Sequence, residues 1–182
     1  MFHYLGLLLI VFSWIVGTYL VFKWRDKNLL TISKHAASSR QASLLFGATL
    51  IVGGLVFYWW LLTWFRPHLG LSWIFTSLLT FTIACQLITG ALPDTAGLVR
   101  RIHRTSAYTM AVSYLPLALS IIAAPKISFV ARLLCEILGT YMLFSFITVV
   151  ILKKAHNWYL LFQALYVVAM QVIILVAAYI EG

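Results

Sequence analysis

The chain is poor in charged residues, and above all in acidic ones. Only four of its 182 residues are Asp or Glu, and charged residues of all kinds make up 9% of the sequence. Soluble domains carry roughly 25% charged residues. Hydrophobic residues make up 63% of this chain, and a soluble fold of this size could not hide so much apolar surface. The shortage of charge therefore excludes a soluble domain and predicts an integral membrane protein.

Cysteine is also scarce. The chain has two cysteines, Cys85 and Cys135, and both fall within long apolar runs. In the expected topology their depths in the membrane differ by about 12 Å, at roughly 1.5 Å of rise per helical residue. A disulfide does not tolerate that separation. We interpret both as small apolar packing residues, and they indicate no particular redox compartment.

The net charge of +9 does not indicate a nucleic-acid partner. The basic residues flank apolar runs and form no separate polar surface. Basic residues at the ends of membrane helices set topology and meet anionic headgroups. The predicted partners are therefore the lipid bilayer, anionic lipid headgroups and partner membrane proteins, and no nucleic acid.

Six apolar runs are each long enough to cross a bilayer, which needs about 20 residues. The predicted fold class is all-α, a polytopic integral membrane six-helix bundle, with residues 1–182 forming a single transmembrane domain. Ser38 with Gln41 resembles a capping box that opens the second helix. Gly53-Gly54 permit a close helix contact, and Pro116 lies inside the fourth helix. The expected spans are residues 2–22, 43–65, 71–92, 105–124, 128–152 and 157–180.

The distribution of Lys and Arg predicts the orientation. The chain has 13 such residues, and most of them follow the first, third and fifth spans. Cytoplasmic loops carry the excess of basic residues. We therefore expect a multi-pass protein of the cell membrane with both termini outside the cytoplasm. The residues on the predicted cytoplasmic side are Lys23, Arg25, Lys27, Lys34, Arg40, Arg100, Arg101, Arg104, Lys153 and Lys154.

Several polar side chains are expected near that cytoplasmic face. Ionisable residues at membrane depth are costly and are functional candidates by default. These residues could cap helices, pair with neighbouring arginines or bind a lipid headgroup. They could also bind a metal or orient a water for hydrolysis, and the sequence does not identify a metal or cofactor. The predicted cluster consists of Asp94, His103, Arg104, His156 and Gln163, with Gln86 at the same level.

Catalysis by this cluster is an alternative that has little support from motifs. An enzyme of this kind would be a membrane-interface hydrolase that uses Asp94, His103 and His156. The sequence has no G-x-S-x-G elbow and no H-x-x-x-H pair, which common hydrolases carry. We therefore name no catalytic residue.

A second polar pair lies inside the fifth span. Arg132 and Glu136 are four residues apart, so the two side chains can pair directly, and burying both charges is less costly than burying one. We predict an intramembrane pair. The alternative is that Glu136 faces a cavity, lined also by Gln86 and Gln171, of a small-solute transporter subunit.

A b-type haem protein is a further alternative. The segment from Arg101 to Arg104, followed by Ala107-Tyr108, looks like the His-Arg helix starts of b-type cytochromes. Such helices commonly supply a second histidine deeper in the bundle. The fourth span has no second histidine, and no other histidine is expected at mid-membrane depth.

The second half of the chain resembles a bacterial group of six-helix membrane proteins. The residues that carry this are Thr89-Gly90-Ala91-Leu92-Pro93-Asp94, His103, Ala107, Leu115-Pro116 and Trp158-Tyr159-Leu160-Leu161-Phe162-Gln163. The group is that of domain-of-unknown-function 998, which is related to the DRAM/Frag/Sfk class. The resemblance covers mainly residues 86–180. It implies a six-helix fold and shared positions at Pro93, Asp94, His103 and Gln163, and it implies no reaction.

The sequence thus favours a small polytopic membrane protein that is not an enzyme and that binds lipid or partner helices. One contact is predicted specifically. Pro93 ends the third span, and a short loop makes the third and fourth spans antiparallel neighbours. Asp94 is therefore expected to contact His103, Arg104 or the beginning of the fourth helix.

Overall fold

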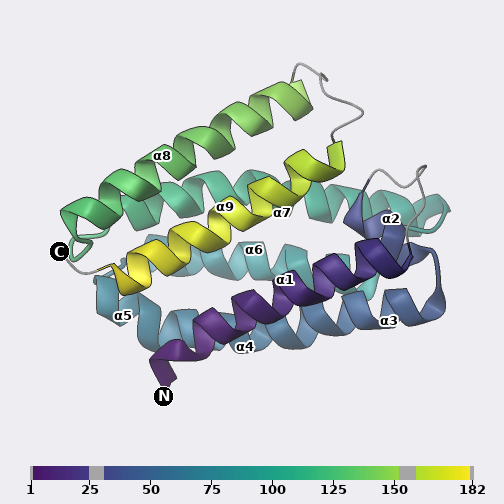
Figure 1. Cartoon of the computed structure of the whole chain (residues 1–182), viewed down its shortest axis with the longest axis horizontal. Coiled ribbons are helices and arrows are strands. Elements are labelled where there is room, and N and C mark those ends of the chain that lie inside the picture. Colours follow the sequence, from purple (N-terminus) through teal and green to yellow (C-terminus); the bar gives the residue numbers. More distant parts are fainter. Residues whose placement is uncertain (1, 25–30, 152–158, 181–182) are drawn as a thin grey trace. The chain divides into compact units, whose positions relative to one another are not determined.

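The computed structural model of the chain describes residues 2–24, 31–151 and 159–180 (Figure 1). Within these ranges, six helices are long and apolar enough to cross a membrane. They are Phe2–Lys23, Arg40–Leu69, Trp73–Ala91, Gly97–Ile122, Phe129–Val149 and Leu160–Tyr179. The structure therefore confirms the predicted all-α class with six candidate spans.

The spans are built from shorter elements. The first consists of a 3-10 turn, η1 (Phe2–Tyr4), and α1 (Leu5–Lys23), and the short helix α2 (Ile32–Ala37) follows it. The second runs through α3 (Arg40–Ala48), the π-helical turn η2 (Thr49–Gly53), α4 (Gly54–Trp60), a second π-helical turn η3 (Leu61–Phe65) and α5 (Arg66–Leu69). The others are α6 (Trp73–Ala91), α7 (Gly97–Ile122), α8 (Phe129–Phe146) with the π-helical turn η4 (Ile147–Ile151), and α9 (Tyr159–Tyr179).

The second span begins at a different cap from the one predicted. Ser39, and not Ser38, is the N-cap: its side chain accepts a hydrogen bond from the Ala42 amide at 3.0 Å. The Ser38 hydroxyl donates instead to the carbonyl of His35, at the end of α2. The capping-box prediction failed because α2 occupies the residues immediately before α3, so Ser38 serves the helix that ends there.

The fourth span begins earlier than predicted, at Gly97 and not at residue 105. The basic residues before position 105 suggested a loop because they are charged. Arginine is nevertheless a good helix former, and its long side chain reaches water from a helix end. Arg100, His103 and Arg104 consequently project from the first turns of α7. Pro116 lies inside the same helix, as predicted.

The chain divides into two compact units. Unit 1 comprises Met1–Trp59 and Thr80–Met110, and unit 2 comprises Trp60–Leu79 and Ala111–Gly182. The second, third and fourth spans contribute residues to both units. The single transmembrane domain expected from the sequence stays a prediction.

Unit 1 is held together by close packing around α3. The helix α1 lies against α2 and α3 (Figure 1). A Cβ atom added to Gly47 would lie only 2.7 Å from the carbonyl oxygen of Gly90 in α6, so glycine is required for this approach. Beside it, the Gln86 amide donates to the carbonyl of Leu50 in η2 at 2.9 Å. Gly54, as predicted, allows a close contact, because Gln86 lies directly over it.

Unit 2 contains an antiparallel pair formed by α8 and α9. The Ser128 hydroxyl donates to the carbonyl of Ile180 at 2.9 Å, and the Cys135 thiol donates to that of Ile173 at 3.6 Å. Since the residue number falls along α9 as it rises along α8, the two helices run in opposite directions. Cys85, in unit 1, and Cys135 are both free and buried, in agreement with their interpretation as packing residues.

Large apolar side chains remain exposed along the spans. They include Leu8, Ile15, Leu119 and Phe144, each more than 60% exposed. On a soluble protein such surfaces would be unusual, but on a membrane helix they face lipid tails. The protein is therefore a multi-pass membrane protein in contact with the bilayer.

Candidate functional site

The turn between α6 and α7 places a buried carboxylate beside two arginines. The Asp94 side chain is only 4% exposed. Arg104 binds it side-on, with Nε 3.1 Å from Oδ1 and Nη2 3.4 Å from Oδ2. Arg100 Nε lies 3.6 Å from Oδ1. The expected contact between Asp94 and the start of the fourth span is therefore present, through Arg104.

The two arginines keep much of their surface in water. Their side chains are 48% exposed at Arg100 and 53% exposed at Arg104. Arg100 also donates through Nη2 to the carbonyl of Thr95. A guanidinium has five N–H donors, so both groups retain donors that Asp94 and Thr95 do not use. The buried carboxylate thus holds the two guanidinium groups on one side, while the side of each group that faces away from Asp94 stays accessible.

His103 has a different partner from Asp94. Its Nδ1 lies 2.5 Å from the carbonyl oxygen of Leu92, just beyond the end of α6. Carbonyls at a helix C-terminus lack partners within the helix, so the imidazole satisfies one of them. His103 is 2% exposed, and its Nε2 has no hydrogen-bond partner among the described residues. His103 therefore links the beginning of α7 to the backbone just after α6.

The helix α2 supplies the opposite side of the site. Thr31 is its N-cap, and its hydroxyl oxygen accepts from the Lys34 amide at 3.2 Å. His35 is buried, with Nδ1 2.9 Å from the Thr31 carbonyl. These two local contacts fix the first turn of α2, and so determine where the side chain of Lys34 begins.

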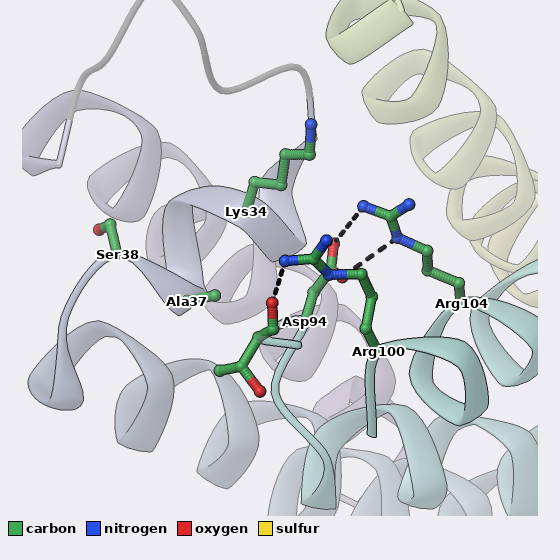
Figure 2. Close-up of a pocket in the computed structure, with 7 residues that line it drawn as sticks. Lys34, Ala37, Ser38, Asp94, Arg100 and Arg104 are labelled. Carbon is green, nitrogen blue, oxygen red and sulfur yellow. Dashed lines mark hydrogen bonds and ion pairs between the residues drawn. The ribbon is translucent and has the colours of Figure 1, made fainter. Parts of the chain in front are cut away.

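These elements line an open pocket of about 380 Å³ within unit 1. Three of the side chains around it are cationic, and one, Asp94, is anionic. No ion pair is recorded for Lys34 in the part of the chain that the structure describes, whereas both arginines are paired with Asp94. Figure 2 shows the Asp94 carboxylate between the two guanidinium groups, with Lys34 rising from α2. The lining residues are Lys34, Ala37, Ser38, Asp94, Thr95, Arg100 and Arg104.

The structure brings together only part of the predicted polar cluster. Asp94 and Arg104 are in direct contact, and His103 contacts the same turn through Leu92. Gln163 lies on α9 and belongs to unit 2, where its Oε1 is buried without a hydrogen-bond partner among the described residues. His156 lies outside the described residues. A common site for all five stays a prediction.

Arg132 and Glu136 are both exposed in the structure. Arg132 Nη2 donates to the carbonyl of Ala124 at 3.3 Å. Within residues 31–151, no ion pair between Arg132 and Glu136 is recorded. The Ala124 carbonyl lies just after the C-terminus of α7, where a positive charge is favoured, and this accounts for the direction in which Arg132 points.

Sequence reasoning placed Lys34 and Arg100 among the basic residues that meet headgroups but did not include either in the predicted polar cluster. Thr31, three residues before Lys34, is a recognisable N-cap signal for the short helix α2. The spacing of Arg100 and Arg104 places both on one helical face once the helix is known to begin at Gly97. The earlier helix start is therefore the feature that would have identified the arginine pair.

The charged side chains around Asp94 in the described pocket are cationic. Over the described ranges, no group of three His, Cys, Asp or Glu side chains is arranged to hold a metal ion. The Asp94 carboxylate is engaged by guanidinium groups and not by His103. Cation-lined pockets of this type instead suit anions, because guanidinium groups match the oxygen spacing of carboxylates and phosphates.

Comparison of the chain with protein-family models, with curated proteins and with solved structures finds no match. The resemblance to the domain-of-unknown-function 998 group therefore rests on the residues quoted above.

Proposed function

We propose that this protein is a non-enzymatic membrane protein that binds anionic lipid headgroups at the pocket of unit 1. The proposal rests on the charges of the side chains around the pocket. Three cations, Lys34, Arg100 and Arg104, surround a single carboxylate that is almost fully buried. The described lining of the pocket therefore carries a net positive charge.

The position of the pocket suits a lipid. Its lining residues come from α2, from the turn after α6 and from the first turns of α7. Each of these segments lies beside the end of an apolar span. A headgroup bound there would have its acyl chains beside the exposed apolar side chains of the spans, while its phosphate meets the cations. Basic residues at such a level attract anionic headgroups by about 1 kcal/mol each.

The orientation of the chain is part of the proposal. Ten of the 13 Lys and Arg residues lie on the side that carries the pocket in the expected topology, which favours the cytoplasmic leaflet. Cysteines introduced at positions 2 and 34 provide the test in intact cells. We expect an impermeant thiol reagent to label position 2 and not position 34, and the reverse pattern would overturn the orientation.

The lipid role is tested by native mass spectrometry of protein purified in a mild detergent. Anionic phospholipid should be retained in excess over its share of the source membrane. Lys34→Gln should reduce the retained lipid, since Lys34 lines the pocket and holds no recorded ion pair with a described residue. The matched control is Arg101→Gln, which removes the same charge from an exposed α7 residue that does not line the pocket.

Three patterns of lipid retention decide whether the pocket binds the lipid. Loss of lipid in Lys34→Gln, retention in Arg101→Gln and recovery in Lys34→Arg would support the pocket. Equal retention in wild type, Lys34→Gln and Arg101→Gln would overturn it. An equal loss in both glutamine variants would overturn it also, because it would show attraction to the general positive charge of that face.

A further inference from the structure

We infer that the pocket of unit 1 selects headgroups that end in a phosphate monoester over those with a phosphodiester. This rests on the proposed function and adds the chemical class of the headgroup. A monoester phosphate is exposed at the end of its headgroup, carries a charge close to −2 at neutral pH and above, and offers three terminal acceptor oxygens. A diester carries one negative charge and has two such oxygens.

The charge of the lining fits the dianion. Lys34, Arg100 and Arg104 contribute three positive charges and Asp94 one negative charge, so three minus one leaves a net charge of +2. A diester would leave one positive charge of the pocket without a counterion, whereas a monoester dianion would neutralise the pocket.

The hydrogen-bond donors fit three oxygens as well. Arg104 uses Nε and one hydrogen of Nη2 on Asp94, and Arg100 uses Nη2 on Thr95. Toward the other described residues, both guanidinium groups therefore leave Nη1 and part of Nη2 available to donate. The ammonium group of Lys34, on the α2 side, supplies a third donor group. One terminal phosphate oxygen can thus be assigned to each cation.

Asp94 is the positioning residue of this arrangement. Its side-on contact with Arg104 and its proximity to Arg100 hold the planar groups in fixed orientations. It is 4% exposed, so it does not compete with an entering anion at the surface. Arginines without such a partner would lose side-chain entropy when an anion binds. Because Asp94 already restrains Arg100 and Arg104, less side-chain entropy is lost on binding.

Helix ends of both kinds lie beside the pocket. Ser38 lines the pocket just before the N-cap of α3, and Thr95 lines it just before α7 begins at Gly97. Helix N-termini carry partial positive charge and favour phosphate, whereas the C-terminus of α2, which ends at Ala37 in the same lining, carries partial negative charge. The attraction for a phosphate is therefore assigned to the three cationic side chains and not to the helix ends.

The test compares lipids in nanodiscs of phosphatidylcholine that contain equal small fractions of phosphatidic acid or of phosphatidylglycerol. The pH is about 8, above the second pKa of a phosphate monoester, which is about 6. We expect wild type to bind phosphatidic acid about fivefold more tightly than phosphatidylglycerol. This is the factor that one added ion pair of roughly 1 kcal/mol gives. Lys34→Gln should reduce this ratio towards one, Lys34→Arg should restore it, and Arg101→Gln should leave it unchanged.

The possible failures are distinguishable. Equal binding of the two anionic lipids, both above phosphatidylcholine, would overturn the monoester selectivity while the headgroup function stands. Binding of neither above phosphatidylcholine would overturn both. Displacement of phosphatidic acid by an equal concentration of glycerol 3-phosphate would assign the pocket to a soluble phosphate monoester and overturn its assignment to lipid.

Discussion

Replacing Asp94 with Ala should destabilise the protein measurably, because this carboxylate joins the turn after α6 to the first turns of α7. Its side chain is 4% exposed, while the paired arginine side chains are 48% and 53% exposed. Removing one partner of a fully buried ion pair costs about 3–5 kcal/mol, whereas an exposed pair contributes about 0–1 kcal/mol. Half-exposed guanidinium groups remain solvated after the change, so we expect a loss of about 1–3 kcal/mol, in the range of charge-assisted hydrogen bonds.

Asp94→Asn should give an intermediate loss. The amide keeps the size of the side chain and one oxygen that can accept from Arg104 Nε. Its NH2 group, however, would stand where Arg104 Nη2 donates to the second carboxylate oxygen, which places donor against donor. Asn should therefore recover part of the stability lost in Asp94→Ala, but not all of it.

The assay is the free energy of unfolding in mixed detergent micelles, measured by titration with a denaturing detergent. Arg101→Ala is the control, because Arg101 is exposed near the start of α7 and forms no ion pair with any described residue. Surface replacements of this kind usually change stability by less than about 0.5 kcal/mol. If Asp94→Ala and Arg101→Ala gave the same small change, the reasoning from burial and pairing would be refuted.

The remaining predictions concern packing and capping, and the same assay checks them. Gly47→Ala should cost about 1–3 kcal/mol, because its new Cβ would lie 2.7 Å from a backbone oxygen of α6. Gly53→Ala should be neutral or stabilising by about 0.4–1 kcal/mol, because a Cβ at position 53 meets nothing within 4 Å. Equal losses in the two variants would contradict the close approach. Ser39→Ala should cost about 1 kcal/mol as the loss of an N-cap and Ser38→Ala less, and the opposite order would contradict the assigned cap. Gln86→Leu should cost about 0.5–1.5 kcal/mol through the loss of its hydrogen bond to Leu50, and an unchanged stability would show that this bond contributes nothing.

Much of the fold could be predicted from the sequence because the physical signals are local. Each apolar run is as long as a bilayer is thick, and few charges interrupt it. Pro93 stops α6 because it has no amide hydrogen to donate. With a short connection to the next span, this was enough to expect a contact between Asp94 and the start of α7, and the structure contains it through Arg104.

The rest depends on features that no short pattern carries. The helix α2 has only six residues, too few for a helical period to emerge, so Lys34 could not be assigned to a pocket. Five residues of span two form the π-helical turn η2, which lies where Gln86 reaches Leu50. Such turns are rare, and no short pattern in the sequence predicted this one. The partner of His103 is a backbone carbonyl, and sequence reasoning about side-chain chemistry favours partners such as Asp94.

The most direct test of the central claim is whether an anionic lipid physically covers the pocket. Ser38→Cys places a thiol at an exposed position of the pocket lining, and Gln41→Cys places one nearby at an exposed position outside it. The two native cysteines are buried and should react slowly. Both variants would be reconstituted in phosphatidylcholine nanodiscs with and without phosphatidic acid, and their rates of reaction with a maleimide compared.

We predict that phosphatidic acid slows the labelling of Ser38→Cys severalfold and leaves Gln41→Cys unchanged. Adding Lys34→Gln should remove the protection of Ser38→Cys. Equal labelling rates of Ser38→Cys with and without the anionic lipid, or equal protection of Gln41→Cys, would contradict the assignment of a lipid headgroup to this pocket.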